Sequence, residues 1–134
     1  MCKLLRQCGP LIGRILLSTI FIIAGFKKIT GFTVTAGMMA SKGLPMAEIL
    51  LVLTILIELG GGLMILTGWK ARWAATAIFL FIIPVTAVFH PVWSDPGQFN
   101  SFYKNLAIMG GMMYIMVYGS GPVGADDGCC PKKQ

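Results

Sequence analysis

Residues 46–69, MAEILLVLTILIELGGGLMILTGW, form an apolar run with a carboxylate, Glu58, near its middle. A membrane-spanning helix needs about 20 mostly apolar residues, so this run is long enough to cross a bilayer. A carboxylate at that depth costs roughly 2.5–3.5 kcal/mol to insert, and such groups normally face a protein interior or a wet cavity. Three glycines follow at positions 60–62, and small residues let another helix pack close to the backbone. The run therefore predicts a span whose polar face lies against other helices.

The composition of the whole chain is that of a membrane protein. Of its 134 residues, 56% are hydrophobic and only 12% are charged, which is unusual for a soluble domain. Eleven Lys and Arg residues against five acids give a net charge of +6. No basic face with interleaved aromatic residues occurs outside the apolar runs, so we expect no nucleic-acid partner. We interpret the positive charges as flanks of membrane spans.

The apolar runs predict four spans, at about residues 11–28, 46–69, 73–90 and 102–118. We expect a short amphipathic helix at the membrane surface between the first two spans, within residues 31–44. Pro10 suits the first turn of a helix, and Pro84 predicts a kink in the third span because it removes a backbone hydrogen bond. The predicted fold is all-α: a four-helix, up-down-up-down membrane bundle. It comprises an N-terminal segment 1–10, a membrane domain 11–122 and a polar tail 123–134.

Four spans would place both chain ends on one side of the membrane. That side carries seven of the eleven positive residues: Lys3, Arg6, Arg14, Lys70, Arg72, Lys132 and Lys133. This excess favours cytoplasmic termini in a bacterial inner membrane. All four cysteines, Cys2, Cys8, Cys129 and Cys130, would then lie in the cytoplasm, where disulfides are rare. Their spacing fits no standard zinc pattern, so we expect no metal site.

Two predicted helix faces carry polar groups into the membrane. One face holds Arg14, Ser18, Phe21, Gly25 and Lys28, and the other holds Thr54, Glu58, Gly61, Gly62 and Ile65. Packing these faces together would bury both charges. At 1.5 Å per residue, however, Arg14 lies about 5 Å and Glu58 about 16 Å inside the cytoplasmic boundary. A direct ion pair therefore needs tilt, an extended arginine or a water, and the alternative is a protonated Glu58 bonded to Thr54, Ser18 or Tyr114.

A second group of polar residues is predicted at the outer end of the bundle: Lys27, Lys28, His90, Asp95, Lys104 and Asn105. Lysines at span ends commonly reach toward lipid head groups, whereas His90 could exchange a proton near neutral pH. His90 is the only histidine, which excludes a haem held by two histidines of one chain. Glu58 and Arg14 could serve only to fix helix register, or Glu58 could carry a proton beside a ligand.

Several short motifs together resemble the DoxX family of small bacterial membrane proteins, within the wider group that contains DoxD. They are Gly13-Arg14, Gly25 with Lys27-Lys28, Gly43-Leu44-Pro45, Glu58-Leu59-Gly60-Gly61, Gly68, Arg72, His90, Lys104-Asn105-Leu106-Ala107 and Gly110-Gly111. The resemblance covers about residues 11–122 and implies a four-helix protein of the inner membrane. It also implies links to quinone-coupled sulfur oxidation and to thiol or oxidative-stress complexes. It supplies no established catalytic residues.

The leading hypothesis is a membrane subunit that binds a quinone and passes reducing equivalents from a partner oxidoreductase. Glu58 and His90 are the candidate proton carriers, and the candidate contacts to the quinone head group are Arg14, Lys28, Lys104 and Asn105. The chain has no flavin, haem or iron–sulfur motif, so its electron donor must come from elsewhere. Whether it has enzymatic activity of its own stays open. The alternatives are a proton-coupled exporter that uses Glu58, working as a homodimer, and a non-catalytic scaffold for redox enzymes.

Overall fold

A computed structural model describes residues 2–125, and every regular element in that range is helical. The elements are α1 (Cys2–Thr30), α2 (Phe32–Ser41), α3 (Ala47–Ile55), the π-helical turn η1 (Leu56–Gly60), α4 (Gly61–Thr67), α5 (Ala71–Phe89), the short 3-10 helix η2 (Pro96–Gln98) and α6 (Phe99–Tyr118). The prediction of an all-α chain is confirmed. The predicted short helix between the first two spans is present as α2, and its position at a membrane surface stays a prediction.

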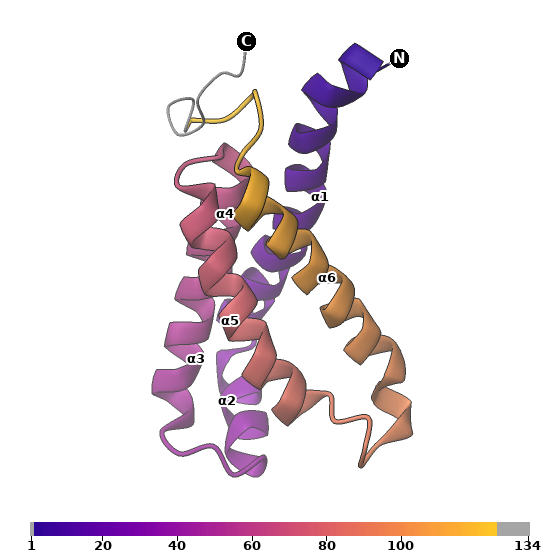
Figure 1. Cartoon of the computed structure of the whole chain (residues 1–134). Helices are drawn as coiled ribbons and strands as arrows, with labels where there is room; N and C mark the ends of the chain where they lie inside the picture. The colour runs from indigo at the N-terminus through magenta and orange to yellow at the C-terminus, as the bar shows by residue number, and fades with distance from the viewer. Residues whose placement is uncertain (1, 126–134) are drawn as a thin grey trace.

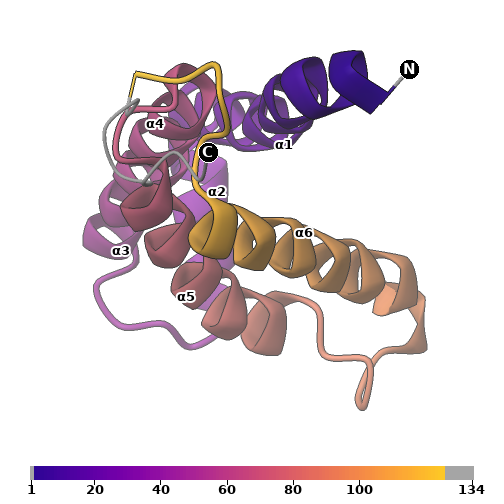
Figure 2. The ribbon, with the colours of Figure 1, turned by 45° about the horizontal axis from the view of Figure 1, so that its top comes forward.

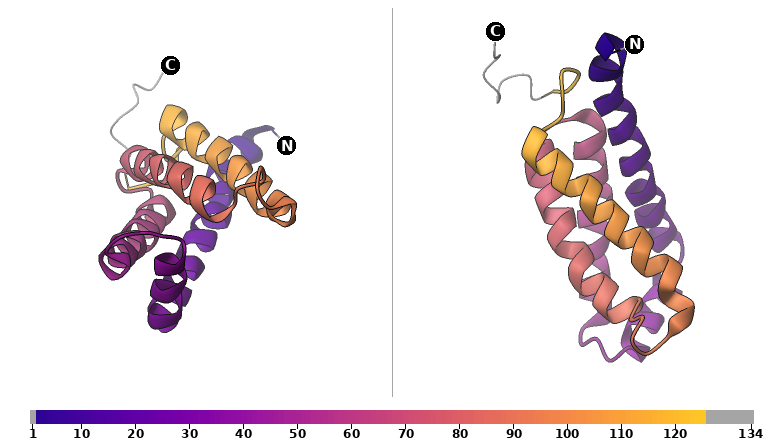
Figure 3. Two further views of the ribbon diagram at one scale, coloured as in Figure 1. Left: turned by 90° about the horizontal axis from the view of Figure 1, so that it is seen from below. Right: turned by 45° about the vertical axis from the view of Figure 1, so that its right-hand side comes forward.

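The long helices run from one end of the molecule to the other, with α1 and α6 sloping in opposite directions (Figure 1). α3, η1 and α4 follow one another without a break and pack against α1 and α5, while α6 packs along α5. The tilted view of Figure 2 shows α6 on the side of α5 that faces away from α3. The end-on view of Figure 3 shows α5 and α6 together on one side of the molecule. The start of α1 and the segment that follows α6 lie at the same end (Figure 1).

Three helical stretches of residues 2–125 are long and apolar enough to cross a membrane: Leu4–Thr30, Ala47–Thr67 and Ala71–Phe89. α6 has 20 residues but does not belong to this set, because Asn100, Lys104 and Asn105 lower the hydropathy of its first half. The three spans correspond to the first three predicted from the sequence.

Two boundaries differ from the prediction. α1 begins at Cys2 and includes Pro10 in its interior, so the expectation that Pro10 lies in a first helical turn is wrong. The fixed φ of proline is compatible with a helix, and the missing N–H removes one backbone hydrogen bond. α6 begins at Phe99 rather than near residue 102. Asp95 caps the preceding η2, its carboxylate accepting a hydrogen bond from the Gly97 N–H at 2.9 Å.

The core lies where α1, α4, α5 and α6 meet. Ile65, Ala75, Ile78 and Met112 are completely buried there. Glycines allow the close approach of α1 to the second span: a Cβ added to Gly25 would lie 2.6 Å from the Cγ of Leu59 on η1, and one added to Gly62 of α4 would lie 3.1 Å from the Cγ1 of Ile22. Such close packing through small residues is typical of helices in membranes, and it buries Arg14, Ser18 and Glu58 on these faces.

Candidate functional site

The two polar helix faces predicted from the sequence are the faces that pack together. On α1, Arg14, Ser18, Phe21 and Gly25 are buried and Lys28 is half-buried; opposite them, Glu58, Gly61, Gly62 and Ile65 are buried and Thr54 is half-buried. The helical spacing of these residues was therefore a correct guide to the interface. It did not identify which charges meet there.

Glu58 pairs with Lys28. The Nζ of Lys28 donates hydrogen bonds to Oε1 at 2.9 Å and to Oε2 at 2.8 Å. The side chain of Glu58 is 8% exposed and that of Lys28 is 26% exposed. Helix register explains the choice of partner. Because Gly25 lies against Leu59, Lys28, which is almost one turn further along α1, comes level with Glu58 in the antiparallel helix.

Glu58 lies at the centre of the π-helical turn η1. A single π-turn inside an α-helix is rare and frequently occurs at functional sites. Gly60 and Gly61 close the turn and start α4, and glycine tolerates such local changes of backbone conformation. No pattern of hydrophobic residues in residues 46–69 predicts a π-turn, so the sequence analysis missed it.

The predicted ion pair between Arg14 and Glu58 does not form. Arg14 is only 2% exposed, and its Nη2 donates a hydrogen bond to the backbone oxygen of Val123, in the segment that follows α6. Its Nε and Nη1 are buried without a hydrogen-bond partner in residues 2–125. Arg14 precedes Lys28 by 14 residues, or about 21 Å along α1. Because Glu58 lies level with Lys28, its distance from Arg14 along the helix is larger than the difference of about 11 Å counted from the sequence, and no side chain bridges it.

The alternative partners predicted for Glu58 are also engaged elsewhere. The hydroxyl of Ser18 donates to the Ile15 carbonyl at 3.0 Å, and that of Thr54 donates to the Leu50 carbonyl at 2.9 Å. Tyr114 is exposed and stacks on Tyr118. Among residues 2–125, the hydrogen bonds of the Glu58 carboxylate therefore come from Lys28.

The polar residues predicted to gather at the outer end of the bundle do not form a single group. Asn105 is buried and donates from Nδ2 to the Oγ1 of Thr86 at 2.9 Å, which joins α6 to α5. The Nδ1 of His90 lies 2.9 Å from the Oε1 of Gln98, in the connection between these helices. Lys104 is exposed on α6. Thr86, a hydroxyl in an apolar helix, was not singled out from the sequence, although its polarity was a usable signal.

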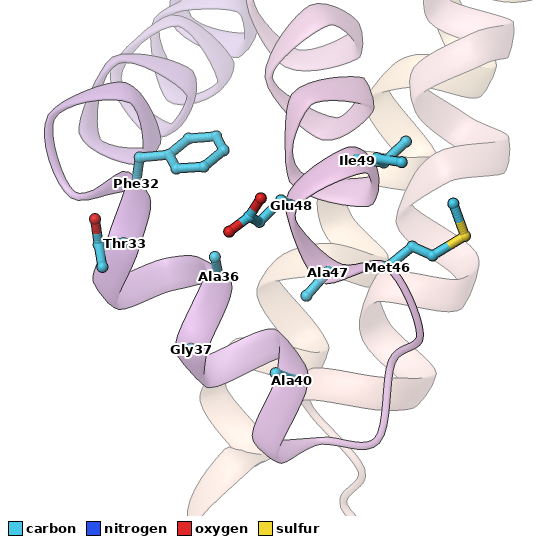
Figure 4. A pocket seen from close by; sticks show the side chains of 9 residues that line it. All are labelled: Phe32, Thr33, Ala36, Gly37, Ala40, Met46, Ala47, Glu48 and Ile49. Atoms are coloured by element: carbon cyan, nitrogen blue, oxygen red, sulfur yellow. The ribbon is translucent and has the colours of Figure 1, made fainter.

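An open hollow of about 510 Å³ separates α2 from the start of α3 (Figure 4). Small residues of α2, including Ala36 and Ala40, line one side, and the carboxylate of Glu48 on α3 turns into it (Figure 4). Glu48 lies in the first turn of α3, where the positive end of the helix dipole stabilises an acidic side chain. None of the lining residues belongs to the Lys28–Glu58 pair.

A family model described as DoxX matches residues 9–91, the range that contains Arg14, Lys28 and Glu58. The chain belongs to the DoxX family. It is also similar to the inner membrane protein YqjF of Escherichia coli K12, with 37% identity over 92% of this chain and 94% of the relative. The inner membrane protein YphA of the same organism is 30% identical over 87% of this chain and 86% of that relative. No solved structure matches.

The family recognised from the sequence motifs is thereby confirmed. This DoxX protein is a membrane protein, as its three apolar helices and its two inner-membrane relatives agree. The names of these relatives state a membrane location and no activity. The charged residues that the helices of this DoxX protein bring together are Lys28 and Glu58.

Proposed function

We propose that this DoxX protein is a membrane subunit of a redox system that binds a quinone at the Lys28–Glu58 pair and works with a partner oxidoreductase. The observation that carries the proposal is a hydrogen-bonded ion pair between apolar helices. Ionisable groups at membrane depth commonly mark the paths of protons or substrates. Glu58 is more deeply buried than Lys28, so a ligand would approach from the lysine side.

A bound quinone would supply two-electron chemistry, taking up two electrons and two protons to become a quinol. Lys28 can donate a hydrogen bond from Nζ to a head-group carbonyl. Glu58 can hold a proton at a carboxylate oxygen and transfer it to a ligand oxygen. If Lys28 turns toward a ligand, Glu58 loses its counter-charge and binds a proton more readily. Ligand binding and proton uptake would thus be coupled, while the electrons come from the partner oxidoreductase in thiol, sulfur or oxidative-stress metabolism.

The other residues predicted to contact the quinone have weaker support. Arg14 is about 21 Å from Lys28 along α1, so we leave it out of this site. Asn105 is engaged with Thr86, and Lys104 is exposed. The proposal needs neither of them, nor His90, and their contribution stays a prediction.

The proposal includes four crossings of a bacterial inner membrane, with both termini in the cytoplasm. α6 has 20 residues, or about 30 Å at 1.5 Å per residue, which matches the hydrocarbon thickness of a bilayer. Its buried Asn105 bonds to Thr86 of α5 rather than facing outward. The turn between α4 and α5 lies at the end where α1 starts (Figure 1). Lys70 is in this turn and Arg72 is in the first turn of α5, as the bias toward positive cytoplasmic loops requires.

Binding of decylubiquinone to the purified protein in lipid nanodiscs tests the proposed function. We expect saturable binding that weakens at least about tenfold, or 1.4 kcal/mol, in Lys28→Met and in Glu58→Gln. Lys27→Met is the matched control, because Lys27 is the exposed neighbour of Lys28 on the same turn. The melting temperature of each variant separates lost binding from lost folding. Wild-type protein without saturable binding, or an equal loss in Lys27→Met, contradicts the proposal.

The π-turn favours a second candidate, the proton-coupled exporter. A π-turn is a place where a helix can change its hydrogen-bond register, and such a change at Glu58 could link protonation to a movement of the second span. Glu58→Gln would then abolish substrate-dependent proton movement in vesicles. A non-catalytic scaffold would instead keep its partner binding in Glu58→Gln.

A further inference from the structure

The buried charge of Arg14 is not explained by the Lys28–Glu58 site. A guanidinium stays charged at physiological pH and carries five N–H donors. Only its Nη2 has a partner, a neutral backbone carbonyl, while Nε and Nη1 are buried and unpaired in residues 2–125. Residues 2–125 contain three acidic side chains, and each lies elsewhere. Glu48 is in the first turn of α3, Glu58 pairs with Lys28, and Asp95 caps η2. A buried charge without an opposite charge is costly.

Arg14 lies in a cradle of small residues. A Cβ added to Gly68 would lie 2.0 Å from its Nη1, and one added to Gly124 would lie 3.1 Å from the same nitrogen. The buried Ser120 lies between these glycines, within 3.1 Å of either added Cβ. Gly68 ends α4, whereas Ser120 and Gly124 follow α6. Two distant parts of the chain thus meet around one guanidinium.

Residues 119–125, here called the cover, close this cradle. Their sequence is GSGPVGA, and they form no helix or strand. Within residues 2–125, two hydrogen bonds attach the cover to other helices: Arg14 to the Val123 oxygen, and the Ala125 N–H to the Thr67 oxygen at 3.2 Å. The side chain of Val123 is 44% exposed. A segment with few hydrogen bonds and little buried apolar surface opens at a low free-energy cost.

We propose that Arg14 is the core of a binding site for a phosphate-type oxyanion, and that the cover closes this site. When the cover is closed, the backbone oxygen of Val123 occupies the position at which an anion oxygen would bind Arg14. When the cover opens, the three guanidinium nitrogens can donate to the ligand, and the ligand supplies the negative charge that a carbonyl lacks. Planar guanidinium groups are preferred partners of phosphate oxygens. This site is separate from the quinone site and does not depend on it.

Two further positively charged residues follow Gly68 closely in the chain: Lys70, just before α5, and Arg72, in its first turn. The guanidinium of Arg72 lies against Gly119 of the cover, where an added Cβ would lie 3.2 Å from its Nε. The Nζ of Lys70 lies 5.3 Å from the centre of the Trp69 ring. Trp69 and Trp73 are exposed on either side of this turn, and exposed tryptophans are typical of the head-group layer of a membrane. A lipid phosphate and a free phosphate could both reach this level.

Thermal unfolding of the purified full-length protein in detergent tests the proposal. The melting temperature is measured with inorganic phosphate and with sodium chloride at equal ionic strength. We expect a saturable rise with phosphate in the wild type and none in Arg14→Gln, because a ligand stabilises the state that binds it. Arg6→Gln is the matched control, since Arg6 is exposed on the same helix, and it should keep the full rise. A wild type without response, or an equal rise in Arg14→Gln, overturns the proposal.

A second variant keeps the test valid if Arg14→Gln does not fold. Ala125→Pro removes the N–H that bonds to the Thr67 oxygen and leaves Arg14 unchanged. Because the open state becomes more populated, we expect half-saturation at a several-fold lower phosphate concentration. A phosphate response that is unchanged or weaker in Ala125→Pro contradicts the role of the cover.

Nanodiscs distinguish the two sources of phosphate. If a lipid head group is the ligand, adding phosphatidylglycerol to phosphatidylcholine nanodiscs should raise the melting temperature of the wild type and remove its response to inorganic phosphate. If the ligand is free phosphate, that response should persist in both lipid mixtures. Either result supports the oxyanion site when Arg14→Gln abolishes it. The oxyanion site is overturned if the melting temperature responds neither to phosphatidylglycerol nor to inorganic phosphate, or if Arg14→Gln retains the response.

Discussion

Lys28 donates hydrogen bonds to both carboxylate oxygens of Glu58 and so ties the last turn of α1 to the π-turn η1. The two residues are thirty positions apart, and the helices that carry them approach closely through glycines. The attraction between two charges in such a place is opposed by the cost of removing both from water. The pair is therefore more important for which helices meet, and at which register, than for net stability.

Removing one partner of the pair should destabilise the protein unequally. Lys28→Met leaves a carboxylate buried without a counter-charge, and we expect a loss of about 3 kcal/mol. Glu58→Gln leaves a lysine that can reach toward solvent, so we expect only about 1–2 kcal/mol. The double variant Lys28→Met/Glu58→Met should recover most of the loss. Unfolding in one detergent with increasing denaturant measures all three, and equal small losses in both single variants would contradict a buried pair.

The contact between α1 and η1 should not tolerate a methyl group at Gly25. A Cβ there would lie 2.6 Å from the Cγ of Leu59, so we expect Gly25→Ala to cost about 1–3 kcal/mol. At Gly13 on the same helix an added Cβ meets nothing within 4 Å, and Gly13→Ala should be neutral or stabilising by up to about 1 kcal/mol. Melting temperatures of the two variants measure the difference. Similar values for both would argue against the close approach.

The hydrogen bond between Asn105 and Thr86 should couple α6 to α5. A double-mutant cycle with Asn105→Ala and Thr86→Val isolates this term, and such bonds in membrane proteins contribute about 0.6–1.7 kcal/mol. Asn100→Ala is the control, because Asn100 is exposed near the start of the same helix. A coupling energy indistinguishable from zero would mean that the two side chains do not meet in the membrane.

The proposed topology predicts where fused reporters act. Alkaline phosphatase is active only outside the cytoplasm, so a fusion after Ser94, between α5 and α6, should be active. A fusion after Gln134 should be inactive, and a fluorescent protein at the same place should fluoresce. Active phosphatase at Gln134 would show that α6 does not cross the membrane or that the chain has the opposite orientation.

The sequence predicts the packed helix faces well because burial in a membrane leaves a periodic pattern. Arg14, Ser18, Phe21 and Gly25 recur at helical spacing, and all four are buried as expected. Counting residues also indicated that Arg14 and Glu58 lie at different depths, but it gave about 11 Å where the structure has about 21 Å. The sequence does not show the register between α1 and η1, which depends on how Gly25 meets Leu59. That register places Lys28 beside Glu58.

Other features have no local signal at all. The partner of Arg14 is a backbone oxygen 109 residues away, and the chain reaches it only because α6 returns to the end where α1 begins (Figure 3). The π-turn at Glu58 is a local change of backbone hydrogen bonding, and the spacing of side chains does not predict it. Cys129 and Cys130, for which the sequence suggested no role, lie outside the described residues.

Chemical crosslinking in native membranes tests the Lys28–Glu58 pairing most directly. In a chain whose four native cysteines are replaced by serine, Lys28→Cys and Glu58→Cys should be joined by a short bifunctional thiol reagent. Lys27→Cys with Glu58→Cys should not, because Lys27 is exposed on another face of α1. Equal crosslinking of both pairs, or a cysteine at position 58 that reacts freely with a lipid-soluble reagent, would contradict a carboxylate sheltered between α1 and the second span.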